Sequence, residues 1–328
     1  MSPLLITFIV TALAFDFLNG FHDSANIVAT MISSRAMGPR QALLLSAAAH
    51  FAAPFIFGVA VAITIGHKVV QPHASTIAVV MAALLAAIAW NLLTWFLGIP
   101  ASSSHALVGG LVGAAIVGHG VDAVQFQGLL KIVTALLLSP LVGLTGGYML
   151  MKLVLFLARG ATPRINWFFK RVQIITALAL ALSHGTNDAQ KTMGIITMGL
   201  MGAGILTRFQ VPLWVIAASA GAISLGTAMG GWRIIRTLGG KFYKIRPVHG
   251  FTSQVASATV IMSAALLGGP VSTTQVVSSA ILGVGSAERL GKVRWGVAGQ
   301  ILTAWVLTIP ASGLLAALAY LLVRHIVT

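Results

Sequence analysis

The sequence predicts an all-α polytopic membrane protein, and three features of its composition support that prediction. Of its 328 residues, 58% are hydrophobic and 8% are charged, whereas soluble domains typically have about 25% charged residues. The mean hydropathy is +0.97. Apolar runs recur along the whole chain, and many approach the ~20 residues that a membrane-spanning helix needs. A β-barrel would show short alternating segments instead.

The composition also excludes several classes of site. There are no cysteines, so disulfides and thiolate metal sites are ruled out. The net charge is +15, but the basic residues gather in a few loops, as is typical of cytoplasmic loops that face anionic lipid. We therefore expect no nucleic-acid partner. The first apolar run, from Pro3 to about Leu18, lacks a basic leading segment and a small-residue cleavage site, and we interpret it as a retained helix.

The chain contains an internal repeat. The stretch GFHDSAN begins at Gly20 and GTNDAQK begins at Gly185, and GIPASSSH (98–105) resembles GPVSTTQ (269–275). Both pairs occur in the same order at nearly the same offset, which indicates a duplication. We expect a first repeat over residues 1–165 with a hairpin tip near 98–105. The second repeat covers 166–328, with a tip near 268–275.

The distribution of charge predicts that the two repeats are inverted. Fifteen of the 20 Lys and Arg residues fall within four segments, at 35–40, 152–171, 233–246 and 289–294. The loops at corresponding positions of the other repeat are poor in basic residues. By the positive-inside rule, corresponding loops then lie on opposite sides of the membrane. Inverted repeats are typical of secondary transporters.

This charge bias predicts a path through the plasma (inner) membrane with the basic loops cytoplasmic and both termini external. The helices that cross are 3–34, 41–66, 128–157, 172–206, 211–231 and 295–323. Two pairs of apolar segments, 75–97 with 101–118 and 252–268 with 271–286, are joined by short uncharged turns. We interpret each pair as a re-entrant hairpin whose tip stays inside the protein.

The hairpin tips predict an anion site. Each has a proline followed by three hydroxyl residues, which would occupy the first turn of the second arm. Free backbone N–H groups and the positive end of the helix dipole favour an anion there. The alternative is that the hydroxyls cap the helix and pack against neighbouring helices.

The two remaining motifs predict a cation site. Asp23 and Asp188 each lie partway along an apolar segment, next to a glycine. We expect the helices to be broken near Gly20–Asp23 and at the matching point of the second repeat, with carboxylate and carbonyl oxygens holding Na⁺ or a proton. Lys191 is left open: it would counter Asp188, contact an anionic substrate or reach toward a cavity. Nearby histidines are expected to be neutral and hydrogen-bonded.

These motifs resemble those of a known family. GFHDSAN and GTNDAQKTMG are similar to the two G-x-N-D-x-x-N signatures of inorganic phosphate transporters of the PiT type (solute carrier family 20), and PASSSH and PVSTTQ are similar to that family's proline–hydroxyl motifs. The resemblance extends from about residue 10 to 320. Position 22 is His where the signature has Asn, and position 191 is Lys where it ends in Asn.

The resemblance implies cation-coupled phosphate import by a homodimer in the lipid bilayer, with Na⁺ or H⁺ as the driving ion, no other cofactor and no enzymatic activity. The implied sodium site contains Asp23, Asp188 and Asn187. The implied phosphate contacts are Asn26, Ser103, Ser104, Gln190, Thr273 and Thr274.

Three alternatives stay open from the residues alone. The first is a permease for another oxyanion such as sulfate, and the second is a passive anion channel. The third is an intramembrane hydrolase with an Asp23–Asp188 dyad or a Ser104–His105 pair. Adjacent residues on a helix do not face each other, which disfavours that pair.

Overall fold

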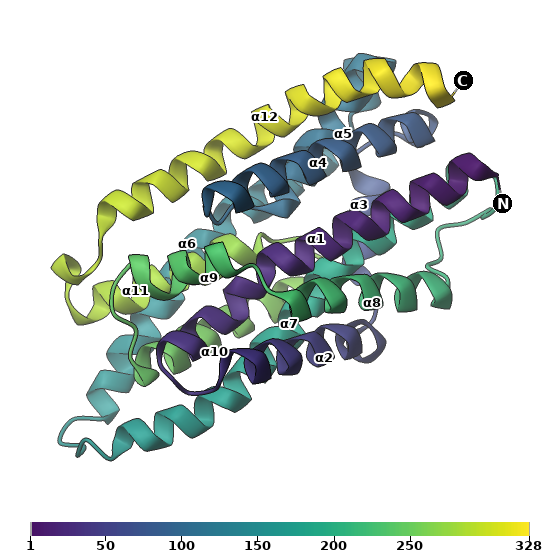
Figure 1. Cartoon of the computed structure of the whole chain (residues 1–328). Helices are drawn as coiled ribbons and strands as arrows, with labels where there is room; N and C mark the ends of the chain where they lie inside the picture. Colours follow the sequence, from purple (N-terminus) through teal and green to yellow (C-terminus); the bar gives the residue numbers. More distant parts are fainter. Residues whose placement is uncertain (1, 328) are drawn as a thin grey trace.

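The computed structural model describes residues 2–327, apart from the side chains at positions 67, 326 and 327, and this part of the chain is helical (Figure 1). Within these described residues, five helices are long and apolar enough to cross a membrane, or up to seven if each of two bent helix pairs counts as one span. The α-helices are α1 (Pro3–Ser33), α2 (Pro39–Phe57), α3 (Ala60–Lys68), α4 (Ile77–Leu97), α5 (Ser103–His119), α6 (Phe126–Leu157), α7 (Ile165–Gly202), α8 (Leu213–Met229), α9 (Trp232–Arg236), α10 (Pro247–Leu266), α11 (Thr273–Glu288) and α12 (Trp295–Val327). The described residues also form short 3₁₀-helices, η1 (Pro72–Ala74), η2 (Val121–Ala123) and η4 (Leu290–Lys292), and a short π-helix, η3 (Thr237–Lys241).

The first hydroxyl of each triplet caps a helix. The Ser102 side chain accepts a hydrogen bond from the backbone N–H of His105 at the start of α5, and Ser272 does the same for Gln275 at the start of α11. These bonds satisfy donors that a helix N-terminus leaves free. Gly98 and Gly268 end the preceding arms with φ of 68° and 70°, a conformation that glycine adopts without steric cost.

The expected helix breaks beside the two aspartates are absent, and this expectation was wrong. α1 and α7 run without interruption through Asp23 and Asp188. The neighbouring glycines serve close packing instead, because a Cβ at Gly20 would overlap the carbonyl oxygen of Ile223, and one at Gly185 would crowd the backbone of His50.

The breaks lie in the next helix of each half. α2 and α3 meet at 85°, and α8 meets the segment that begins with α9 at 56°. Gly58 and Gly230 stand at these two bends with φ of 80° and 73°. A bend exposes backbone groups that a straight helix would pair internally, so each bend needs partners from elsewhere in the protein.

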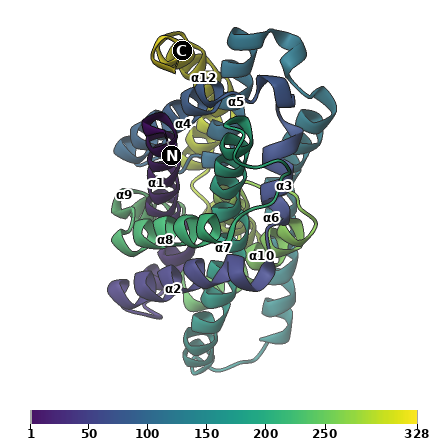
Figure 2. The ribbon, with the colours of Figure 1, turned by 90° about the vertical axis from the view of Figure 1, so that its right-hand side faces the viewer.

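Helices from the first half of the chain pack closely against helices from the second half. α5 packs against α12 and α11 packs against α6, while α1 lies against α8 and α2 against α7 (Figures 1 and 2). These crossings are close: a Cβ at Gly113 would overlap the backbone of Gly313, and one at Gly283 would overlap that of Leu144. Small residues that allow such approach are typical of membrane helix pairs. The core therefore contains elements from both halves.

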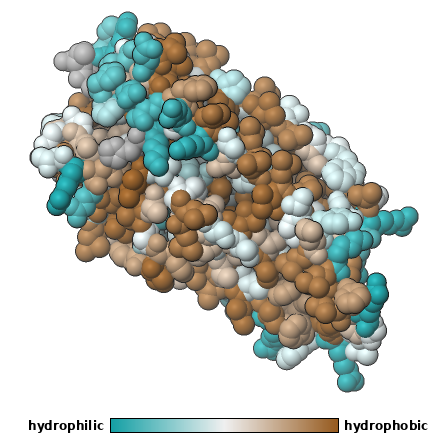
Figure 3. All heavy atoms as spheres, turned by 180° about the vertical axis from the view of Figure 1, so that it is seen from behind, coloured by the Kyte–Doolittle hydropathy of each residue, from teal (hydrophilic) through white to brown (hydrophobic). Residues whose placement is uncertain are grey.

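The surface is that of a multi-pass membrane protein. A broad apolar band separates polar groups at the two ends of the molecule (Figure 3). Side chains such as Leu157, Leu213 and Met149 are more than two-thirds exposed, as expected for contact with lipid. Both termini lie at one end, and the α6–α7, α9–α10 and α11–α12 connections, which carry basic residues, lie toward the other (Figure 1).

Candidate functional site

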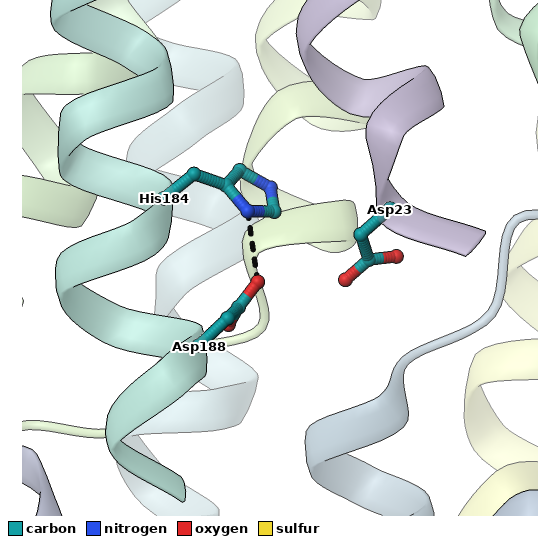
Figure 4. A group of neighbouring side chains, drawn as sticks. All are labelled: Asp23, His184 and Asp188. Carbon is teal, nitrogen blue, oxygen red and sulfur yellow. Dashed lines mark ion pairs between the residues drawn. The ribbon is translucent and has the colours of Figure 1, made fainter. Parts of the chain in front are cut away.

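The two signature aspartates meet at the centre of the protein. Asp23 comes from α1 and Asp188 from α7, and His184 lies one turn before Asp188 (Figure 4). One ligand atom from each of these three residues lies within 4.8 Å of the others. All three side chains are buried, with exposed fractions of 3%, 0% and 0% in the order Asp23, His184, Asp188. Two carboxylates this close in a low-dielectric interior need positive charge or hydrogen-bond donors around them.

The tip of the second hairpin supplies such donors. The Thr273 hydroxyl lies between the carboxylates, 2.9 Å from Asp188 Oδ2 and 3.4 Å from Asp23 Oδ2. The Thr274 hydroxyl donates to Asp23 Oδ1 at 2.9 Å. Both threonines are buried. The first turn of α11 is therefore inserted between α1 and α7.

Asn26 and His184 close a ring of contacts around this tip. The Asn26 amide donates to the Thr274 hydroxyl at 3.0 Å and lies 3.5 Å from His184 Nε2. His184 Nδ1 in turn lies 2.8 Å from Asp188 Oδ2. Asn26 Oδ1 has no partner within the described part of the chain. The ring thus combines α1, α7 and α11 and retains a free acceptor.

Each aspartate also has a basic neighbour from its own helix. Lys191 pairs with Asp188 Oδ1 one turn away, although Lys191 is only 1% exposed. His22 Nδ1 lies 2.9 Å from Asp23 Oδ1. Of the three roles left open for Lys191 by the sequence, the structure shows the pairing with Asp188. The positive charge of the buried Lys191 ammonium offsets the free-energy cost of removing the Asp188 carboxylate from water.

The first hairpin tip lies beside the second without reaching the aspartates. The Ser104 hydroxyl donates to the Val271 carbonyl oxygen at 3.2 Å. The Ser103 hydroxyl is buried and has no hydrogen-bond partner among residues 2–327. His105 Nδ1 lies 2.7 Å from the Ser102 hydroxyl. The two tips therefore differ: the threonines of the second contact carboxylates, and Ser103 of the first leaves a hydroxyl available.

The structure places Gln190 and Asn187 away from the ring. The Gln190 carbonyl oxygen accepts from the backbone N–H of Val61 at 2.7 Å and its amide donates to Gly58 O at 2.6 Å, so it holds the α2–α3 bend. Asn187 donates to the carbonyl oxygen of Gly269 at 3.2 Å, which ties α7 to the second tip. Neither side chain contacts Asp23 or Asp188 in the interactions that the structure describes.

Sequence reasoning did not assign three participants. His22, His184 and Lys191 surround the aspartates. Pairing with Asp188 was one of the three open roles of Lys191, and the two histidines had no assigned partner. Ser24 was also missed: its hydroxyl accepts from the backbone N–H of Gly231 at 2.9 Å and so supports the α8 bend. That role depends on a neighbour about 200 residues away along the chain, and no local pattern signals it.

The arrangement can hold a hard cation. Two carboxylates and the Thr273 hydroxyl present oxygen atoms of the kind that such ions prefer. The amide of Asn26 and the hydroxyls of the tips can contact an anion beside it.

Proteins that are similar to this chain in sequence or in fold are described as phosphate transporters. The chain matches the Phosphate transporter family over residues 19–316. It is 47% identical to a probable low-affinity inorganic phosphate transporter of Bacillus subtilis over 98% of both chains. A protein of the same description from Rhizobium meliloti is 46% identical, over 97% of this chain and 96% of its own length.

Among solved structures, a sodium-dependent phosphate transporter superposes with a TM-score of 0.89 at 26% identity. The match covers 99% of this chain and 100% of the other. These relatives are transporters and not enzymes, which agrees with the expectation from sequence and removes the intramembrane hydrolase. The buried aspartates, the hydroxyl-bearing tips and the match over nearly the whole chain together show that this protein belongs to the phosphate transporter family.

Proposed function

We propose that the protein imports inorganic phosphate by coupling its movement to that of Na⁺ or H⁺. The observation that carries this proposal is the Thr273 hydroxyl, which lies between the carboxylates of Asp23 and Asp188. A hairpin tip rich in donors thereby touches the two groups best suited to hold a cation. The structural neighbour is named as sodium-dependent, which supports Na⁺ as the first ion to test.

The phosphate site in this proposal consists of Asn26, Ser103, Ser104, Thr273 and Thr274. The Ser103 hydroxyl is a neutral donor without a partner in the described residues. The hydroxyls of Ser104, Thr273 and Thr274 would have to exchange their present acceptors for phosphate. Gln190, which the resemblance also implied, joins this site only if it leaves the α2–α3 bend. Neutral donors bind a dianion weakly unless cations are bound nearby, and this dependence is what coupling requires.

The cation site in this proposal is formed by Asp23 and Asp188. Asn187, which the resemblance also implied, lies on α7 next to Asp188 in sequence and is tied to the second tip through the carbonyl oxygen of Gly269. Phosphate next to two carboxylates would be repelled by about 1 kcal/mol or more per charge pair even at high dielectric. A bound cation removes that repulsion, because its charge offsets those of the carboxylates and the phosphate. Cation and phosphate therefore favour each other's binding.

Alternating access between two inverted repeats, 1–165 and 166–328, completes the mechanism we propose. Supporting this are the bends at corresponding positions in α2–α3 and α8–α9 and the prolines at matching places inside α6 and α12. Exposed apolar side chains such as Phe96 and Leu267 flank the hairpin tips, which favours tips that lie at membrane depth.

We further propose that the basic loops face the cytoplasm, that both termini are external, and that the protein is a homodimer. The first two follow from the separation of the basic connections from the termini, by the positive-inside rule. Labelling of a Ser2→Cys variant in intact cells would check on which side of the membrane the N-terminus lies. Light scattering of the purified protein would check its oligomeric state.

The decisive experiment is phosphate uptake into proteoliposomes, with Na⁺ and H⁺ gradients imposed separately. We expect uptake to follow one of these gradients, and Asp23→Asn and Asp188→Asn each to reduce it strongly. Stronger competition by sulfate than by phosphate would favour a different oxyanion. Phosphate flux that ignores both gradients would favour a channel.

A further inference from the structure

Asp16 is a third buried carboxylate, and the function described so far does not use it. It lies on α1 seven positions, about two helical turns, before Asp23, and it is 0% exposed. Neither of its carboxylate oxygens has a hydrogen-bond partner among residues 2–327. Asp23 and Asp188 differ from it, because each contacts a basic side chain and at least one threonine hydroxyl.

Polar side chains near Asp16 also lack hydrogen-bond partners in the described residues. Asn19, one turn further along α1, is 0% exposed, and neither end of its amide has a partner within the described chain. The Thr192 hydroxyl on α7 faces the Asp16 carboxyl, and the two do not form a hydrogen bond of good geometry. Buried polar groups are almost always paired, so three such groups together need an explanation.

The register between α1 and α4 adds a fourth group. The two helices pack side by side, and Thr94 Oγ1 lies 3.5 Å from His22 Nε2. Asn19 and Asn91 each lie three residues earlier, hence on the same faces one turn nearer the N-termini. Asn91 is 2% exposed, and both polar atoms of its amide lack partners in the described residues.

Few charges act on Asp16 from neighbouring helices. Asp188 and Lys191 on α7 are the charged groups whose fields reach it, and they already form an ion pair. Neither α4 nor α8, which both pack along α1, contains a titratable side chain. On the side toward the termini, α1 contributes Phe8 and Ala12, both fully buried. Among the described residues, Asp16 therefore has no ion-pair partner of its own.

We infer that Asp16, Asn19, Asn91 and Thr192 form a second cation site, which takes one positive charge as Na⁺ or as a proton. An ionised carboxylate without a partner in the interior is very costly, and a single bound cation removes that cost. Carboxylate, amide and hydroxyl oxygens are suitable ligands for Na⁺, and the carboxylate accepts a proton equally well. The inference deepens the proposed function and rests on it for its role in transport.

The site is separate from the signature aspartates and differs from them in charge balance. Lys191 already supplies one positive charge to Asp188, so the carboxylate that most needs a cation from solution is Asp16. A cation bound there lies two turns from Asp23 on the same helix. Its binding would stabilise α1 in the position that presents Asp23 and Asn26 to phosphate.

The first test measures cation binding directly and needs no transport. In the purified protein at fixed pH, NaCl in place of choline chloride should raise the melting temperature. Part of that rise should persist in Asp23→Asn, which lacks one carboxylate of the other cation site, and the double variant Asp16→Asn/Asp23→Asn should lose it. If the cation is instead a proton, the Na⁺-free protein should show the infrared band of a protonated buried carboxyl, which Asp16→Asn removes. If the wild type shows neither Asp16-dependent signal, the inference is overturned.

The second test measures coupling in proteoliposomes. Asp16→Asn should lower gradient-driven phosphate accumulation at least about tenfold, while exchange of labelled phosphate at equal concentrations on both sides continues. Asp122→Asn is the matched control, because Asp122 is an exposed carboxylate in η2. If Asp16→Asn accumulates phosphate like the wild type, or if it loses phosphate exchange as well as accumulation, the inference is overturned. If the wild type itself accumulates no phosphate, the proposed function fails, and the binding test still decides on the site.

A second variant guards against misfolding of Asp16→Asn. Asn91→Ala keeps the carboxylate and removes one amide from the neighbouring helix. If the cation is Na⁺, we expect Asn91→Ala to raise the Na⁺ concentration needed for half-maximal stabilisation by at least about fivefold. If it is a proton, the proton concentration at the midpoint of Asp16 protonation should change by at least about the same factor. An unchanged midpoint in a folded Asn91→Ala protein contradicts the proposed site.

Discussion

The Thr273 hydroxyl donates a hydrogen bond to Asp188 Oδ2 at 2.9 Å, and this contact joins the second hairpin tip to the long helix α7. The same hydroxyl lies 3.4 Å from Asp23 Oδ2. The Thr273 side chain therefore links Asp188 on α7 to Asp23 on α1. The second tip thus contacts both carboxylates through one hydroxyl.

Replacing Thr273 with valine should strongly impair transport. Valine keeps the shape and removes the donor, and a hydrogen bond to a charged group contributes about 1.5–3 kcal/mol, which corresponds to about tenfold or more in rate. Initial phosphate uptake in proteoliposomes is the measurement. Thr259→Val is the control, because the Thr259 hydroxyl is exposed and bonds within its own helix, α10. Uptake that is equal in both variants would show that transport does not need the Thr273 hydroxyl.

Replacing Lys191 with methionine should destabilise the protein by about 3–5 kcal/mol, because it leaves Asp188 buried without its ammonium partner. The double variant Asp188→Asn/Lys191→Met should recover most of that loss. Unfolding in detergent gives the free energies, and the single Asp188→Asn variant completes the cycle. Strictly additive effects would mean that the pair contributes nothing to stability.

Gln190→Leu should act on stability before it acts on phosphate affinity. The side chain satisfies backbone groups at the α2–α3 bend, and each unpaired buried group costs about 1–3 kcal/mol. The melting temperature and the apparent phosphate constant should be measured together. Gln190→Glu is the matched variant, since it keeps the acceptor for Val61 and loses the donor to Gly58. A raised phosphate constant at unchanged stability would assign Gln190 to the substrate site.

Two glycines on α8 should respond differently to alanine. A Cβ at Gly226 would overlap the carbonyl oxygen of Phe17 on α1, whereas nothing lies within 4 Å of a Cβ at Gly221. Gly226→Ala should therefore cost about 1–3 kcal/mol through overpacking, and Gly221→Ala should be neutral or slightly stabilising. Thermal unfolding of the two variants compares them directly. Equal melting temperatures would show that α1 and α8 can separate freely.

Much of the architecture could be predicted without coordinates. The arms of both hairpins, the long last helix of each half and the position of the central connection agree with the expected segments to within a few residues. Apolar length and prolines mark such elements locally. The helix breaks could not be placed, because a glycine inside a membrane helix indicates equally a break or a close crossing. At Gly20 the structure shows a close crossing and not a break, because the backbone of Ile223 on α8 lies directly against it.

The sequence by itself determined that the chain is a polytopic membrane protein whose repeated aspartate and hydroxyl motifs resemble those of phosphate transporters, because composition and motif spacing are local properties. Only the tertiary structure decided which of these groups meet. It brought Thr273 between Asp23 and Asp188, paired Lys191 with Asp188, assigned Gln190 to a bend and left Asp16 unpaired. Those outcomes depend on the register between helices far apart in the chain, and that register is set by how closely the glycine crossings let the helices approach.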